Sequence, residues 1–225
     1  KVSFSLQFDI DPILERDKAG ASQIAGDLMS KGTTNRTKEE LNFEVDFMGA
    51  RFFTSAGSIF GSTLKKHQEK LLDIMSDVIK NSDFKEEELE KLKTQYISAK
   101  QTEKDDPDNI AGNVQSVLLF GKDHPYGERT TEETLKNIQL VDVKASYNTY
   151  MKPNVAYLAV VGDIDVKEAK ALITKYFGDW KSGEVPTHKY EMPVAPKTMQ
   201  VVFVNKPGAV QSVISAVNII DLKPG

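Results

Sequence analysis

The chain has 225 residues, of which 40% are hydrophobic and none is cysteine, and its formal net charge is -4. This length and hydrophobic content can bury a substantial core in one large domain or two small ones, which excludes a disordered chain. Because the chain has no cysteine, it can form neither a disulfide framework nor a thiolate metal site. The mild negative charge argues against a nucleic-acid partner, and no apolar run approaches the roughly 20 residues that span a bilayer.

Polar and apolar residues alternate at the start of the chain. The apolar ones occupy every second position from Val2 to Ile10, which predicts a strand with one buried face. Residues 19–31 then predict an amphipathic helix, because their apolar side chains recur at intervals of three and four. Gly32 follows where a left-handed helix cap is expected. The apolar helical positions are Ala21, Ile24, Ala25, Leu28 and Met29.

The following stretch, up to residue 180, alternates between predicted helices and short strands. Capping signals and helical spacing predict helices over residues 38–48, 68–81, 83–104, 108–120, 131–137, 142–150 and 165–177. Strand-forming residues predict a hairpin over 51–56 and 58–64 and a further strand over 155–161. Residues 180–196 contain Pro186, Pro193 and Pro196 and indicate a linker, after which residues 201–205 and 210–218 predict two more apolar strands.

Five short segments stand out in chain order. They are Lys31-Gly32-Thr33, Phe47 to Ala50, Leu119 to Gly127, Tyr150 to Asp163, and Tyr176 to Trp180. Together they resemble the M16 metallopeptidases, the family of pitrilysin, insulinase and mitochondrial processing peptidase, whose motifs include K-G-T, L-F-x-x-H-P-Y-G, V-V-G-D and F-G-x-W. The resemblance covers most of residues 1–218.

In this family the first helix carries an inverted zinc motif, H-x-x-E-H. When Lys31-Gly32-Thr33 is set on the family's K-G-T, Gln23 and Asp27 take the two histidine positions, and Gly26 takes the position of the glutamate base. A catalytic zinc site needs three protein ligands and an open position for water, which an amide and a single carboxylate do not supply. The resemblance therefore implies no catalytic residue and no metal ligand set in this chain, with zinc expected only in a catalytic partner.

The family's third zinc ligand is a glutamate on a later helix. Alignment on Asp105-Asp106-Pro107 places it near Ser98 or Ala99, whereas counting from Asp27 places it within residues 101–105, which include Glu103. We favour the first alignment because its anchor is nearer. A rival interpretation is a working zinc endopeptidase with the unusual ligands Asp27, Glu103 and His124. His124 lies in a turn beside Pro125, and the other two histidines, His67 and His188, are far from it in the sequence, which favours a locally satisfied histidine.

The first strand of the predicted hairpin holds the candidate substrate-binding residues. In catalytic members of the family an exposed strand edge pairs with the substrate peptide by strand addition. The resemblance therefore points to this strand as a peptide-binding edge, and an ordinary covered hairpin is the alternative. The residues concerned are Arg51, Phe52, Phe53, Thr54 and Ser55.

The resemblance implies an α+β fold, with a mostly antiparallel sheet and helices packed on one face. We expect a non-catalytic M16-like domain over residues 1–190, followed over residues 191–225 by a linker and the first strands of a second such domain, in a longer parent protein. The expected function is to form a substrate chamber or assembly with a catalytic zinc peptidase domain, in the same parent chain or in a separate subunit, and to meet an extended peptide there. The alternatives are the active zinc endopeptidase and a purely structural subunit. No feature of the sequence indicates the cellular compartment.

Overall fold

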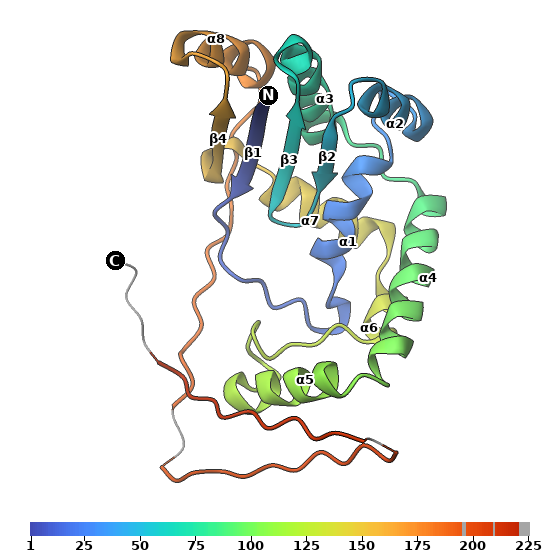
Figure 1. Ribbon diagram of the computed structural model, residues 1–225, viewed down its shortest axis with the longest axis vertical. Coiled ribbons are helices and arrows are strands. Elements are labelled where there is room, and N and C mark those ends of the chain that lie inside the picture. The colour runs from blue at the N-terminus through green and yellow to red at the C-terminus, as the bar shows by residue number, and fades with distance from the viewer. Residues whose placement is uncertain (195–196, 209, 221–225) are drawn as a thin grey trace.

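The computed structural model describes residues 1–194, 197–208 and 210–220, and a sheet of four strands forms its centre (Figure 1). Each neighbouring pair of strands is antiparallel, and their order across the sheet is β2-β3-β1-β4. This arrangement confirms the α+β class and the strands predicted before residue 165. The strands are β1 (Val2–Phe8), β2 (Arg51–Thr54), β3 (Ser58–Thr63) and β4 (Ala156–Gly162).

The alternation of residue types in β1 decides which face of the sheet is buried. Its polar residues lie on one face and its apolar residues on the other, as the period of two predicts. The register extends the apolar face across the sheet, since Leu6 pairs with Ile59 of β3 and with Leu158 of β4. Helices cover this face, so the predicted one-sided packing is confirmed. The buried residues of β1 are Val2, Phe4, Leu6 and Phe8.

Helix α3 (Gln68–Asn81) lies on the buried face against β3 (Figure 1). The approach is so close that a Cβ atom at Gly61 would come within 2.9 Å of the Met75 sulfur, which explains a glycine inside this strand. The opposite face of the sheet is open, and it carries Phe53, Tyr157 and Val161 with more than half of each side chain exposed.

The helices lie close to their predicted bounds because their capping and apolar spacing signals are strong. Helix α1 continues into a 3-10 turn, Met29–Lys31, and α4 leads away from the sheet to α5 at the far end of the molecule (Figure 1). Within the described residues no helix combines the length and the apolar character that crossing a membrane requires. The remaining bounds are α1 Ala21–Leu28, α2 Lys38–Phe47, α4 Glu86–Glu103, α5 Pro107–Phe120, α6 Glu132–Asn137, α7 Leu140–Tyr150 and α8 Val166–Phe177.

The proline-containing segment after α8 has no helix or strand over its described residues, as predicted, but it is fastened to the body of the domain. The amide of His188 donates to an Asp11 carboxylate oxygen at 2.8 Å, and the Tyr190 hydroxyl accepts from the amide of Leu14 at 3.2 Å. Both bonds join this segment to the loop between β1 and α1. Pro196 lies outside the described residues.

The prediction of two strands over residues 201–205 and 210–218 is wrong, because the structure has no strand among the described residues of these ranges. Alternating apolar residues set the propensity for a strand, but a ladder also needs a neighbouring strand to exchange backbone hydrogen bonds. Here the side chains of Val202, Val204 and Val213 instead line a cavity together with Ile110 and Val114 of α5. Residue 209 and residues 221–225 lie outside the described residues.

Candidate functional site

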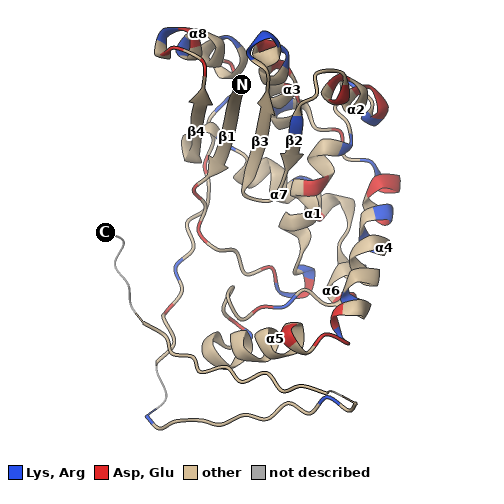
Figure 2. Ribbon diagram, in the orientation of Figure 1, with Lys and Arg blue, Asp and Glu red and all other residues tan. Residues whose placement is uncertain are grey.

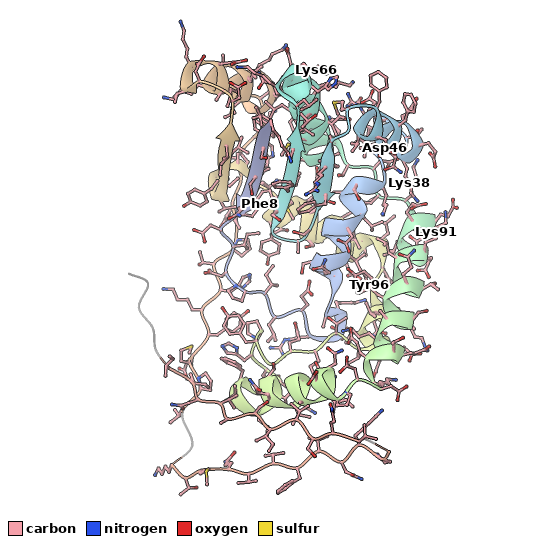
Figure 3. The ribbon with its side chains drawn as sticks, viewed as in Figure 1. Phe8, Lys38, Asp46, Lys66, Lys91 and Tyr96 are labelled. Carbon is pink, nitrogen blue, oxygen red and sulfur yellow. The ribbon has the colours of Figure 1, made fainter. Side chains whose placement is uncertain are left out.

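The expected zinc-motif positions lie on α1, and their side chains are bonded to one another and to α4. The Gln23 side-chain amide donates to one Asp27 carboxylate oxygen at 3.3 Å. The Tyr96 hydroxyl, from α4, donates to the other oxygen, and Figure 3 shows Tyr96 where α4 faces α1. Both carboxylate oxygens of Asp27 are therefore engaged in hydrogen bonds within the protein.

Gly26, expected from the sequence at the position of the family's catalytic base, is where α1 touches the β2–β3 hairpin. A Cβ atom built on Gly26 would lie 2.1 Å from the carbonyl carbon of Ser55 and 2.2 Å from the nitrogen of Ala56. These are backbone atoms, which cannot swing aside as the end of a flexible side chain can. The hairpin therefore occupies the space that a glutamate would need, and glycine is required here by packing.

The N-terminus of α1 is held by a glutamate from the preceding loop. The Glu15 carboxylate accepts from the amides of Gly20 and Ser22, both at 2.7 Å, and Glu128 accepts from the amide of Glu15 at 2.9 Å. Burial raises the pKa of Glu15 above its ordinary value, and the charge of Glu128 acts in the same direction. These bonds satisfy amides that the first turn of a helix leaves without partners, and they fix where α1 begins.

Tyr96 is the residue of this site that sequence reasoning missed. Burial, followed by the hydrogen bond to Asp27 and the charge of that carboxylate, raises the pKa of Tyr96 to about 12. The available signal was helical spacing, because Tyr96 follows the buried Leu89 and Leu92 on the inward face of α4. That spacing marks Tyr96 as inward-facing without naming its partner.

Replacing Asp27 with asparagine should lower the pKa of Tyr96 from about 12 toward its usual 10.0. The shift should be partial, because burial is the largest cause of the raised pKa and persists in the variant. An ultraviolet difference titration against the Tyr96→Phe variant isolates this phenol from the other tyrosines. An identical titration of Tyr96 in wild type and Asp27→Asn would show that the two side chains do not meet.

The residues proposed for a third ligand do not complete a metal site. Glu103 lies at the end of α4 and accepts from Lys100 at 2.8 Å. His124 is buried, with Nδ1 accepting from the Tyr126 amide at 3.2 Å and its ring stacked on Phe120. Over the described residues, no group of three or more histidine, aspartate or glutamate side chains could hold a metal ion.

The donor set at the motif therefore does not fit a catalytic zinc ion. Gly26 offers no base, Gln23 is a neutral amide, and Asp27 is bonded on both oxygens. A lone carboxylate on a helix does not hold zinc, which takes three protein ligands in catalytic sites. The structure does not bring the rival ligands Asp27, Glu103 and His124 together, and α4 meets Asp27 through Tyr96 and not through Ser98 or Ala99.

The predicted peptide-binding strand, β2, lies at one edge of the sheet. The Ser55 amide donates to the Ser58 carbonyl at 2.8 Å. In an antiparallel pair only every second residue exchanges backbone hydrogen bonds with the neighbouring strand, and from Ser55 these are Phe53 and Arg51. The backbone groups of Phe52 and Thr54 therefore point away from β3. The buried Thr54 hydroxyl has no hydrogen-bond partner among the described residues. The side chains of Arg51 and Phe53 lie on the open face of the sheet, and the ring of Phe53 stacks on Phe60 with 4.9 Å between centroids. Among the described residues, the backbone groups of Phe52 and Thr54 are thus the ones left unpaired along this edge, whereas Arg51, Phe53 and Ser55 pair with β3.

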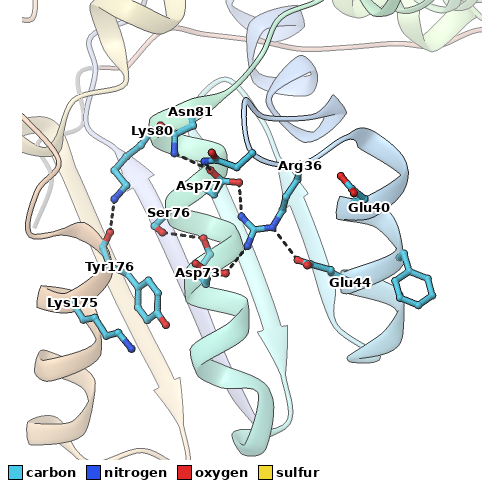
Figure 4. Close-up of a pocket in the computed structure, with 12 residues that line it drawn as sticks. Arg36, Glu40, Glu44, Asp73, Ser76, Asp77, Lys80, Asn81, Lys175 and Tyr176 are labelled. Carbon is cyan, nitrogen blue, oxygen red and sulfur yellow. Dashed lines mark hydrogen bonds and ion pairs between the residues drawn. The ribbon is translucent and has the colours of Figure 1, made fainter.

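A polar cavity of about 630 Å³ lies among α2, α3 and α8 (Figure 4). Arg36 is at its centre, and its guanidinium donates to the carboxylates of Glu44, Asp73 and Asp77. Asp77 also accepts from Thr33, Asn35 and Asn81. Lys70 adds a second cation beside Glu44 and Asp73. Because each of these carboxylates is paired within the protein, we interpret the cavity as an ion network that ties α2 to α3, and not as a ligand site.

Comparison with known sequences extends over nearly the whole chain. The family model described as insulinase, peptidase family M16, matches residues 3–119, more than half of the chain, and that of the peptidase M16 inactive domain matches residues 137–219. An uncharacterized zinc protease of Rickettsia felis is 25% identical over 174 residues, which cover 75% of this chain and 42% of that protein. The beta subunit of human mitochondrial-processing peptidase is 25% identical over 190 residues, which cover 79% of this chain and 36% of the subunit. The chain thus spans less than half the length of these relatives.

Solved structures share the fold. The peptidase M16 inactive domain from Pseudomonas fluorescens aligns with a TM-score of 0.75 and 19% identity, covering 87% of this chain and 49% of that one. A protease from Helicobacter pylori aligns with a TM-score of 0.71 and 19% identity, covering 86% of this chain and 48% of that one. The arrangement of α1 against a hairpin edge and the matches along the sequence lead to one assignment: the chain belongs to peptidase family M16, the insulinase family.

Proposed function

We propose that this chain is a non-catalytic M16 domain that assembles with a catalytic zinc M16 domain, in the same parent chain or in a separate subunit, and helps to enclose the chamber where a peptide is cut. The contact of Gly26 with the backbone of Ser55 and Ala56 carries this proposal, because it leaves no room for a general base. Residues 191–225 then lead toward a second domain. Zinc belongs to the catalytic partner, as the name zinc protease of several relatives suggests.

The domain also offers β2 to an extended peptide. Strand addition needs outward-facing amides and carbonyls at a sheet edge, and those of Phe52 and Thr54 have this orientation. This role separates the proposal from a purely structural subunit, which needs no such edge.

Metal analysis and a cleavage assay test the catalytic part of the proposal. The purified protein should contain substoichiometric zinc, and it should leave an unstructured fluorogenic peptide intact with and without a chelator. A peptidase with an intact H-x-x-E-H serves as the positive control for both measurements. Stoichiometric zinc together with chelator-sensitive cleavage would instead establish the active zinc endopeptidase.

Amide hydrogen exchange tests the peptide-binding part. Saturation with an extended peptide should slow exchange at Phe52 and Thr54, while the amides of β4, at the other edge of the sheet, report any general stabilisation. The Thr54→Pro variant removes the outward-facing amide of Thr54, so it should bind the peptide several-fold more weakly. Equal exchange at β2 with and without peptide would leave the purely structural subunit as the better description.

A further inference from the structure

Helix α2 carries apolar residues on two opposite faces. Leu41 and Met48 point into the core and are at most 5% exposed. On the other side, Phe43 and Phe47 are 70% and 75% exposed, and their rings stack with 6.2 Å between centroids. Phenylalanine is among the residues most often buried, and a helix that is apolar on more than one side usually has more than one packing partner. The sheet and core account for only one of these faces.

Acidic residues border the exposed aromatic pair along one side. Glu39 and Asp46 share the stripe with Phe43 and Phe47, at the helical spacing of i, i+4, i+7 and i+8. Figure 2 shows the acidic residues of α2 on the outside of the molecule. Among the described residues, Glu39 and Asp46 form no ion pair, so their charges face solvent. We call the set Glu39, Phe43, Asp46 and Phe47 the α2 stripe.

The α2 stripe is presented on a rigid element. The Thr37 hydroxyl and the Glu40 carboxylate close a capping box at the start of α2. Arg36, directly before it, bonds Glu44 of α2 and two carboxylates of α3. A surface held in this way loses little conformational entropy on binding, which favours docking without rearrangement.

We propose that the α2 stripe docks a helix of a partner protein, one whose apolar residues recur at i, i+3 and i+4 beside a row of lysines or arginines. The stripe covers nine residues and therefore about two turns of helix, a length that another helix can match with side chains alone. The backbone groups in the body of α2 are bonded within the helix, which argues against an added strand. The basic row on the partner would pair with Glu39 and Asp46, as charges beside an apolar seam do in coiled coils.

Charge also argues against a second copy of this chain as the occupant. A two-fold contact between two α2 stripes would place Glu39 and Asp46 beside the same residues of the other copy, and such like-charge contacts oppose association. The inference is independent of the proposed function, because it concerns a helix outside both the zinc-motif region and β2.

A designed amphipathic peptide tests the proposal without knowledge of the natural partner. The probe is a fluorescent leucine–lysine helical peptide of about 18 residues, and a leucine–glutamate peptide of the same spacing is its control. In anisotropy titrations the protein should bind the leucine–lysine peptide more tightly. The Phe43→Ala/Phe47→Ala variant should weaken binding about tenfold or more, and the Glu39→Lys/Asp46→Lys variant should reverse the preference between the peptides.

Control variants on other helices and a measurement of the oligomeric state complete the test. Val141→Ala and Val166→Ala truncate exposed apolar residues of other helices and should leave peptide affinity unchanged. Thermal unfolding of the double phenylalanine variant should match wild type, because both rings are largely exposed. Equal affinity of wild type and the double phenylalanine variant for the leucine–lysine peptide would overturn the proposal. So would a homodimer in sedimentation that this variant abolishes, because the second copy would then be the occupant.

Discussion

Replacing Gly26 with alanine is expected to lower the free energy of unfolding by about 2 kcal/mol. A Cβ atom at this position would overlap the backbone of Ser55 and Ala56 at 2.1–2.2 Å, so α1 and the hairpin must separate to admit it. In an open helix interior the same change would be favourable by up to about 1 kcal/mol, because alanine forms helices more readily than glycine. Urea unfolding followed by circular dichroism measures the difference.

Gly112 supplies the matched control for this variant. It lies within α5, is exposed, and has no atom within 4 Å of a built Cβ. Gly112→Ala should therefore raise the free energy of unfolding by up to about 1 kcal/mol. Opposite signs at the two glycines are the predicted result. If Gly26→Ala were as stable as Gly112→Ala, the hairpin would not occupy the space of the missing base.

Replacing Arg36 with leucine is expected to destabilise the protein by about 3 kcal/mol at neutral pH. The change removes the guanidinium that Glu44, Asp73 and Asp77 share, and leaves the buried Asp77 carboxylate without its cation. Chemical unfolding measures the loss. Lys136→Ala, which breaks an exposed pair with Glu132, is the control and should change stability by less than about 1 kcal/mol.

The destabilisation caused by Arg36→Leu should become smaller as the pH falls. Burial alone would raise the pKa of Asp77, but the hydrogen bonds from Asn81, Asn35, Thr33 and Arg36 outweigh it, so its pKa lies below the ordinary 3.8. A carboxyl with a lowered pKa in the folded state stabilises the protein above its unfolded pKa, and this contribution is lost as pH falls through the folded value. Wild type and Arg36→Leu should therefore converge in stability as the pH falls below about 4. A difference that stays constant with pH would contradict this role of Asp77.

The regular elements of the domain were predictable because their signals are local. Helix α3 matches its predicted bounds, since the spacing of its apolar residues and the breaks at both ends lie within one short segment. The hairpin of β2 and β3 follows in the same way from strand-forming residues on both sides of Gly57. Family motifs then supplied what periodicity could not, namely a mostly antiparallel sheet with helices on one face and the helix to compare with a zinc site.

The contacts between distant segments were not predictable from local patterns. Asp27 and Tyr96 are 69 residues apart, and Arg36 and Asp77 are 41 apart, so no periodicity connects them. The described residues of 201–208 and 210–218 show the opposite failure, because their clear strand pattern forms no ladder without a neighbouring strand. Sequence reasoning interpreted Gly26 as an absent base, and only the position of the hairpin shows that it is also a packing requirement.

The seating of the hairpin on Gly26 sets the order in which a carboxylate could be introduced at this position. A glutamate at residue 26 would overlap the backbone of Ser55 and Ala56, so the hairpin would first have to be remodelled. A design that builds a zinc motif on α1 therefore begins with the loop between β2 and β3, and the exchange of side chains on the helix follows.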